Sequence, residues 1–185
     1  MLTDTIKDLD IAAEYLKKGK TVVFPTETVY GLGAVATNEA AVAKIFEAKG
    51  RPSDNPLIVH IGTIEEVDNY ITDVPEIARL CMEAFWPGPL TLVMNVKNNS
   101  IAPNVTAGLS TVGLRMPDND VALTLLRQLG QPVAAPSANR SGRPSPTEAR
   151  HVYDDLTGRI PMILDGGATG IGVESTVLDV TTPTP

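Results

Sequence analysis

Four loops of this sequence gather hydroxyl, amide, guanidinium and ammonium groups among glycines and prolines. The first is FPTETVYGLG at residues 24–33, in which two threonines and a tyrosine follow a short apolar run. The hydroxyls can donate and accept hydrogen bonds, and the two glycines allow a ligand to approach the backbone closely. Because each loop lies beside a short apolar segment, we expect the four loops to converge on one edge of a sheet and form a pocket.

The second loop, KGRPSDNP at residues 49–56, is positively charged. Lys49 offers a point charge and Arg51 a planar fork, and this pair suits a polyphosphate. Two cations at the end of a helix are also favourable to the helix dipole without any ligand. Asn55 stands between two prolines, which stiffen the backbone. This rigidity favours a loop that binds a ligand over a loop whose charges only contact solvent.

The third loop, APSANRSGRPSPTEAR at residues 135–150, contains Ser137, Asn139 and three arginines. Its SPTE segment at 145–148 predicts a capping box with proline at the first helical position. The free N–H groups of such a helix start can bind an anion. The loop therefore fits a phosphate site, with a purely structural loop as the alternative.

The fourth loop, DGGATGIGVEST at residues 165–176, has four glycines and can approach a ligand or close over it. Arg115 ends the segment STVGLRM and can grip a carboxylate with two hydrogen bonds. His60 ends PLIVH near the second loop, where it serves a ligand or simply bonds to backbone. Together these loops predict nucleoside triphosphate chemistry with a second, small anionic substrate.

Two short motifs do not fit their usual sites. GKT at 19–21 resembles the end of a P-loop, but Glu14 stands where that motif needs glycine. GLGAVA at 31–36 resembles a dinucleotide fingerprint, but six residues separate it from the preceding strand. Cys81 is expected on the core face of a helix and His151 on an exposed helix.

Composition limits the possible classes of protein. The chain has 185 residues, 43% hydrophobic, which suits a single globular domain. Its net charge of -7 argues against a protein that coats nucleic acid without sequence preference. One cysteine excludes an internal disulfide and a cysteine-rich zinc site. The absence of a long apolar run and of a signal-like N-terminus favours a cytoplasmic protein.

Helix and strand patterns alternate along the chain, which predicts an α/β fold of about seven strands and five helices around one twisted sheet. LTLVMNV and STVGLRM follow each other without a helix between them, so we expect a mixed sheet. The predicted strands are 20–24, 56–61, 90–96, 110–116, 132–137, 161–165 and 175–180. The predicted helices are 5–18, 39–49, 75–85, 119–129 and the one that follows Ser145.

Six blocks, PTETVYGLG, KGRPSDNPL, FWPGPLTLV, RMP, PSAN-SG-PSPT and GVESTV, occur in an order that resembles the YrdC-type L-threonylcarbamoyladenylate synthases. The resemblance covers nearly the whole chain. It implies a twisted α/β sheet with a concave basic face. It also implies a reaction of ATP, bicarbonate and L-threonine that yields threonylcarbamoyl-AMP and pyrophosphate, with Mg2+ accompanying ATP. A separate transferase would then modify tRNA to its threonylcarbamoyladenosine form.

The resemblance also assigns residues, and none of them is a metal ligand. The implied catalytic set is Lys49, Arg51, Ser137 and Asn139. The implied ATP ligands are Arg51, Asn55, Thr111, Ser137 and Ser145. The implied threonine ligands are Thr28, His60, Arg115 and Ser175, with FPTETVYGLG as one wall of that pocket. Residues 1–180 would form the catalytic domain and 181–185 the start of a linker, since longer members continue into a second domain.

Two alternatives remain open at this stage. Carbamoyltransferases of the hydrogenase-maturation type carry a similar domain, but they add an acylphosphatase-like segment and Cys-x-x-Cys fingers that this chain does not show. A double-stranded RNA or tRNA-binding module without catalysis would suit a concave basic face. The arginines of residues 140–150 favour that module, and the net charge of -7 counts against it.

Overall fold

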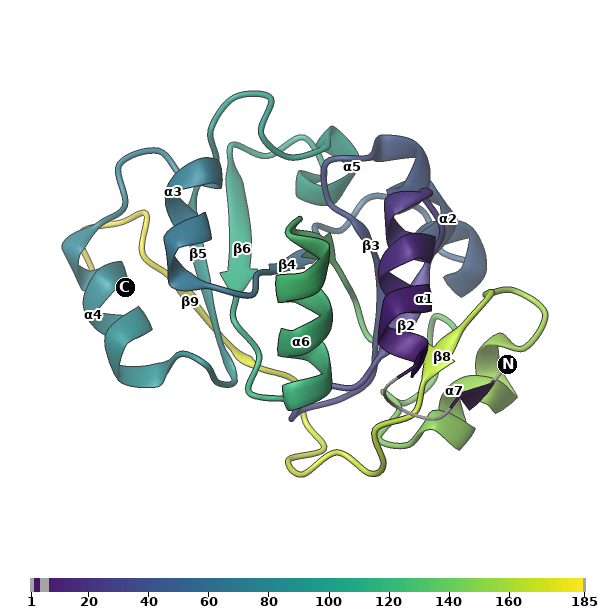
Figure 1. Ribbon diagram of the computed structural model, residues 1–185. Coiled ribbons are helices and arrows are strands. Elements are labelled where there is room, and N and C mark those ends of the chain that lie inside the picture. The colour runs from purple at the N-terminus through teal and green to yellow at the C-terminus, as the bar shows by residue number, and fades with distance from the viewer. Residues whose placement is uncertain (1, 4–6, 185) are drawn as a thin grey trace.

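The computed structural model describes residues 2–3 and 7–184 (Figure 1). Its strands are β1 (Leu2–Thr3), β2 (Val22–Phe24), β3 (Gly31–Val35), β4 (Ile58–His60), β5 (Leu90–Asn95), β6 (Thr111–Arg115), β7 (Val133–Ala134), β8 (Ile163–Leu164) and β9 (Thr176–Asp179). Its helices are α1 (Lys7–Lys17), α2 (Glu39–Lys49), the 3-10 helix η1 (Ile64–Glu66), α3 (Val67–Tyr70), α4 (Glu76–Phe85), α5 (Pro103–Thr106), α6 (Asp120–Leu129) and α7 (Ala149–Leu156). Residues 5 and 6 of the predicted first helix, and residue 185 of the predicted linker, lie outside the described part.

The strands of the described residues form one sheet in the order β1-β8-β2-β3-β7-β4-β6-β5-β9. β8 pairs with β1 and β2, β4 with β6, and β5 with β9 in parallel, whereas the other neighbours are antiparallel. β5 and β6 are antiparallel neighbours without a helix between them. The predicted mixed α/β sheet is therefore confirmed.

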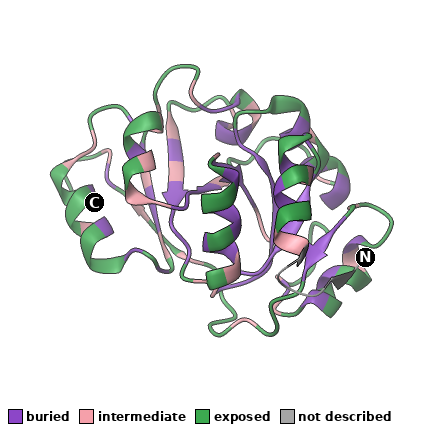
Figure 2. Cartoon of the chain, viewed as in Figure 1, coloured by how far each residue is buried: buried purple, intermediate pink, exposed green. Residues whose placement is uncertain are grey.

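Helices cover both faces of the sheet, and the strand residues alternate between two core layers. Val22 and Phe24 of β2 pack with the apolar residues of α1 and α6, whereas Val23 joins the layer that contains α2, α4 and α7. Figure 2 shows that the inner strands are mostly buried and that the outer faces of the helices are exposed. His60 of β4 is paired with Val133, which lies in the α1 and α6 layer, so the His60 side chain emerges on that face.

The ends of α2 follow the local signals in the sequence. The Asn38 side chain accepts a hydrogen bond from the Ala41 N–H at 3.0 Å, and Gly50 adopts φ 67° at the C-terminal end. Only glycine adopts this left-handed conformation without strain. The position of Gly50 matters for the site because Lys49 and Arg51 stand on either side of it.

Two expectations about local structure were wrong. Residues 31–33, interpreted as the end of the first loop, belong to the fully buried strand β3. The SPTE capping box does not form, because α7 begins at Ala149 and Ser145 donates its hydroxyl hydrogen to the Glu174 carboxylate instead. The helix start that would have bound an anion at Ser145 is therefore absent there.

Other local expectations are confirmed. Cys81 lies half-buried against the core on α4, and His151 is exposed on α7.

Within the described residues, no helix combines the length and the apolar character that a membrane crossing requires.

Candidate active site

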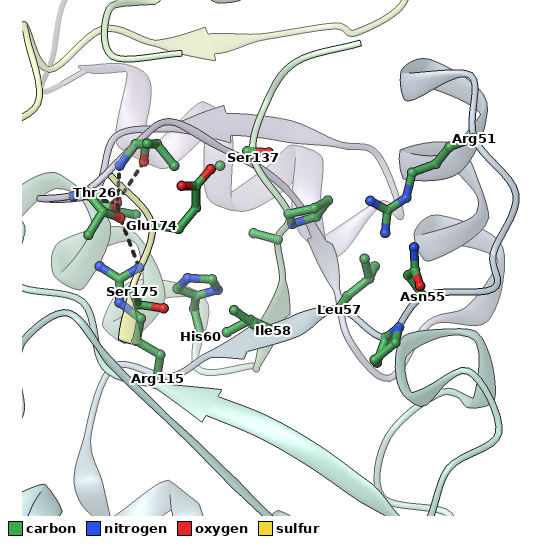
Figure 3. A pocket seen from close by; sticks show the side chains of 16 residues that line it. Thr26, Arg51, Asn55, Leu57, Ile58, His60, Arg115, Ser137, Glu174 and Ser175 are labelled. Atoms are coloured by element: carbon green, nitrogen blue, oxygen red, sulfur yellow. Dashed lines mark hydrogen bonds between the residues drawn. The ribbon is translucent and has the colours of Figure 1, made fainter. Parts of the chain in front are cut away.

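A cavity of about 210 Å³ opens on the sheet face beside the carboxyl ends of β4 and β6. Each of the four polar loops found in the sequence, at residues 24–33, 49–56, 135–150 and 165–176, contributes side chains to this cavity. Figure 3 shows Arg51 and Asn55 at one end, Thr26, Arg115, Glu174 and Ser175 at the other, and His60 and Ile58 between them. Of the eleven different residues assigned from the resemblance, those that line the cavity are Thr28, Arg51, Asn55, His60, Arg115, Ser137 and Ser175.

The FPTETVYGLG segment forms one wall through a turn closed by its own hydroxyl groups. The Thr26 hydroxyl accepts hydrogen bonds from the N–H groups of Thr28 and Val29, at 3.1 and 3.2 Å. It also donates to the Val29 carbonyl at 2.7 Å. These bonds close the turn that joins β2 to β3 and hold the Thr28 side chain in the cavity wall.

Arg115 is the best anchored cation of the cavity. Its Nε donates to the Gly88 carbonyl at 3.3 Å, and Nη1 donates to the Thr28 hydroxyl at 3.1 Å. Nη2 donates to the Glu27 carboxylate, with which it forms an ion pair. A guanidinium has five N–H groups, so three bonds leave two N–H groups for a ligand. Burial lowers the pKa of Arg115 to about 10, and the group stays cationic at neutral pH.

Glu27 was missed in the sequence, although it stands in the middle of the first loop. Its carboxylate accepts from Arg115 and, through its second oxygen, from the Asp118 N–H at 2.6 Å. A buried guanidinium needs a countercharge. The presence of one acidic residue in a loop expected to face Arg115 was the available signal.

His60 lies at the floor of the cavity and is 4% exposed. Burial lowers its pKa to about 4, so the ring is neutral at pH 7. Its ring meets the ring of Phe24 edge to face, with centroids 6.0 Å apart, and its Nδ1 has no hydrogen-bond partner in the protein. His60 can therefore supply a ligand with a hydrogen bond but not with a charge.

Arg51 marks the opposite end of the cavity. Its guanidinium lies 5.6 Å from the centre of the Phe46 ring, which restricts the side chain. Its Nε is buried and has no partner in the protein. An unpaired buried donor on a cation is a group that an anion can satisfy. Asn55 stands at the same end, whereas Ser137 lies between the two ends of the cavity (Figure 3).

Lys49 and Asn139, which the resemblance assigns to the catalytic set, are not among the residues that line the cavity. The Lys49 ammonium donates to the carbonyls of Ser137 and Asn139, the latter at 2.8 Å. Asn139 Nδ2 donates to the carbonyls of Arg140 and Arg143, at 2.9 and 2.8 Å. Burial, followed by the nearby Arg51 charge, lowers the pKa of Lys49 to about 8 against the raising effect of Asp155.

Thr111 and Ser145, assigned to ATP, lie outside the cavity lining. Thr111 begins β6 and shares a face with Arg115, because alternate strand residues point the same way. Ser145 borders a separate hollow beside α7. Arg140, Arg143 and Arg150 are also absent from the cavity lining, and Arg143 pairs with Asp155 at 2.8 Å. Positive charge in the cavity comes from Arg51 and Arg115.

The glycine-rich fourth loop is fastened to the first. The N–H groups of Ile171 and Gly172 donate to the carbonyls of Glu27 and Thr28, each at 3.0 Å. Tyr30 was expected among the pocket hydroxyls, but its side chain is fully buried and its hydroxyl donates to the Gly167 carbonyl at 2.7 Å. Tyr30 therefore supports the fourth loop from beneath.

No group of three or more histidine, cysteine, aspartate or glutamate side chains in the described ranges is arranged to hold a metal ion.

Ser175 places its hydroxyl 2.7 Å from that of Thr91, at the Arg115 end. The site thus offers guanidinium, hydroxyl, amide and neutral imidazole groups for anionic and polar ligands.

The Sua5_yciO_yrdC family model, described as "Telomere recombination", matches residues 14–185. A threonylcarbamoyl-AMP synthase of Bacillus subtilis is 60% identical over 90% of this chain and 48% of its own length. One from Cellvibrio japonicus is 31% identical over 85% of this chain and 83% of its own length.

The structure of Pyrococcus abyssi Sua5 complexed with L-threonine superposes with a TM-score of 0.94 at 50% identity, covering 99% of this chain and 54% of that chain. The chain thus spans about half the length of the Bacillus and Pyrococcus relatives it matches. The family model covers nearly all of the chain, and most of the cavity residues fall in the blocks that carry the resemblance. The chain belongs to the Sua5/YciO/YrdC family.

Proposed function

We propose that this chain is a threonylcarbamoyl-AMP synthase, a nucleotidyltransferase that joins L-threonine, bicarbonate and the magnesium complex of ATP with release of pyrophosphate. The observation that carries the proposal is the pair of unused N–H groups on Arg115, at the opposite end of one cavity from Arg51. Two separated guanidinium groups suit two anionic substrates. The likeness to a Sua5 structure that contains L-threonine supports the same assignment.

At the Arg115 end, the two free N–H groups would grip the carboxylate of L-threonine. Glu27 already balances the Arg115 charge and fixes the plane of the guanidinium. The neutral His60 ring would accept or donate a hydrogen bond without repelling the amine. The hydroxyls of Thr28 and Ser175 stand beside it and would complete the polar contacts.

At the Arg51 end, the guanidinium would bind phosphate oxygens, with Asn55 beside it and Ser137 nearer the middle of the cavity. The cavity of about 210 Å³ is smaller than the roughly 300–1,000 Å³ of most ligand pockets. The nucleotide would therefore extend beyond the cavity. Thr111 and Ser145 stand outside the lining and are the proposed contacts for that part.

The reaction would begin when the amine of threonine attacks bicarbonate and water leaves, which gives a carbamate. A carbamate oxygen then attacks the α-phosphorus of ATP, and the bond from that phosphorus to pyrophosphate breaks. The step requires positioning and neutralisation of charge more than a strong base. Arg51 would neutralise charge on the transferred and leaving phosphoryl groups.

Magnesium would arrive as part of the ATP complex. The described residues offer no carboxylate cluster for a resident ion, and Mg2+ in such complexes is held mainly by phosphate oxygens and water. We further expect a cytoplasmic protein whose product is passed to a transferase that modifies tRNA.

Pyrophosphate release tests the proposal. The purified chain is incubated with ATP, Mg2+ and bicarbonate, with L-threonine or L-serine, and Arg51→Ala serves as the inactive variant. Release that requires L-threonine and falls at least about 100-fold in the variant supports the synthase. If neither release nor threonine binding is found, and RNA binds with a steep dependence on salt, the RNA-binding module replaces it.

A further inference from the structure

Lys49 is a buried cation whose hydrogen-bonding capacity is fully used within the protein. It ends α2 and is 3% exposed. An ammonium has three N–H groups, and three oxygen atoms surround this one. They are the Ser137 carbonyl, the Asn139 carbonyl at 2.8 Å and the Asn139 Oδ1 at 3.5 Å. A phosphate oxygen could bind Lys49 only by displacing one of them.

The segment 137–139 depends on such contacts because it lies outside the regular strands. β7 ends at Ala134, and a single isolated bridge joins Gly31 to Ser137. The Ala138 N–H donates to the Tyr30 carbonyl at 2.8 Å, and the Ser141 N–H donates to the Lys49 carbonyl at 3.1 Å. The end of α2 therefore holds this segment through both the side chain and the backbone of one residue.

Lys49 also connects two chain segments that line the cavity. Ser137 lines the cavity and offers its carbonyl to the Lys49 ammonium. Arg51 lines the cavity two residues after Lys49, across the left-handed Gly50. The spacing between the Ser137 and Arg51 side chains is therefore set from behind the cavity wall. Burial of a charge is tolerated there because every N–H group has an acceptor.

We infer that Lys49 is a positioning residue of the proposed nucleotide site, which holds the Ser137 segment against α2 and does not itself contact the phosphates. This inference rests on the proposed function and changes the role that the resemblance gives to Lys49. A point charge on the phosphates would act independently of Ser137. A clamp acts through Ser137, and the two roles predict different kinetics.

A double-mutant cycle separates the two roles. Lys49→Met, Ser137→Ala and the double variant are compared in kcat/KM for MgATP, measured by pyrophosphate release. Lys44→Met on the same helix is the matched control, since Lys44 is exposed and lies outside the cavity. We expect Lys49→Met to lower kcat/KM by roughly 100-fold and the double variant to match it. Losses that multiply in the double variant would overturn the inference.

Lys49→Gln provides a second comparison and replaces Lys49→Met if the latter does not fold. Glutamine keeps two N–H donors but no charge. A clamp regains at least about tenfold of the lost kcat/KM with glutamine, because the hydrogen bonds matter. A glutamine variant as slow as methionine would indicate that the charge itself acts on the phosphates. L-threonine affinity is expected to stay within about twofold in each variant, because the Arg115 end is intact.

Hydrogen exchange tests the clamp without any turnover. Lys49→Met is expected to speed exchange of the Ala138 and Ser141 N–H groups at least about tenfold, while Lys44→Met leaves them unchanged. Unchanged exchange in a folded Lys49→Met variant would refute the clamp. An inactive wild-type chain would instead refute the proposed function and leave this measurement valid.

Discussion

The guanidinium of Arg115 and the carboxylate of Glu27 form an ion pair with almost no access to solvent. Their side chains are 5% and 12% exposed. The second Glu27 oxygen accepts the Asp118 N–H, so the carboxylate is held at both oxygens. This relationship determines which two N–H groups of Arg115 remain for a ligand.

Removal of the Glu27 carboxylate should therefore destabilise the fold. Glu27→Ala leaves a buried guanidinium without its countercharge, and we expect the free energy of unfolding in urea to fall by about 3 kcal/mol. Glu14→Ala is the control, because Glu14 pairs with Lys17 on the exposed face of α1. It should change stability by less than about 0.5 kcal/mol. If both variants lost a similar free energy of unfolding, burial of the Glu27–Arg115 pair would not be what makes Glu27 important.

Arg115→Lys tests whether the spare N–H groups of Arg115 bind the carboxylate of L-threonine. A lysine has three N–H groups, which the Gly88 carbonyl, Thr28 and Glu27 together can occupy. No pair remains for a carboxylate, so we expect the Kd for L-threonine to rise about 100-fold in calorimetry. Arg79→Lys, at an exposed ion pair with Asp68, should leave the Kd unchanged. Tight threonine binding by Arg115→Lys would rule out the proposed grip on the carboxylate.

His60 should make the fold sensitive to acid. Its pKa is about 4 in the folded chain and about 6.5 when unfolded. Between these values the unfolded chain binds more protons, so stability falls as the pH falls. From pH 7 to pH 5 we expect this ring to contribute a loss of about 2 kcal/mol. Urea unfolding of His60→Gln should lack that part of the loss, and an identical pH dependence in both proteins would disprove it.

Gly33→Ala tests the packing of β3. A Cβ atom there would lie 2.7 Å from Phe24 Cε1 and 2.7 Å from Val133 Cγ1. We expect a loss of about 1–3 kcal/mol in thermal or urea unfolding. Gly170→Ala is the control, since nothing lies within 4 Å of its added Cβ. A neutral Gly33→Ala would mean that the sheet accommodates the methyl group.

Local features were predictable from the sequence because their causes are local. Asn38 and Gly50 end α2 by hydrogen bonds and backbone conformations within a few residues. The same reasoning failed for GLGAV, because glycine usually signals a turn. Here Gly33 serves tight packing between Phe24 and Val133, which lies 100 positions further along the chain. No local pattern contains that information.

The candidate site, too, was predictable only in part. The residue types in the four loops indicated anionic ligands, and seven of the assigned residues do line one cavity. The partners of those residues were not predictable, because Lys49 meets Asn139 and Arg115 meets Glu27 only when the sheet is assembled. Sequence spacing shows which groups are available. It does not show which of them are already occupied by the protein.

The cavity wall joins segments from the beginning, the middle and the end of the chain, from Thr26 to Ser175. Closing such long loops is slow during folding because the entropy cost precedes the stabilising contacts. The pocket should therefore appear late, after most of the sheet. A ligand that binds only the finished pocket shifts the equilibrium toward the native state by mass action. L-threonine would then stabilise only chains that have completed folding, and its binding would distinguish native chains from incompletely folded ones.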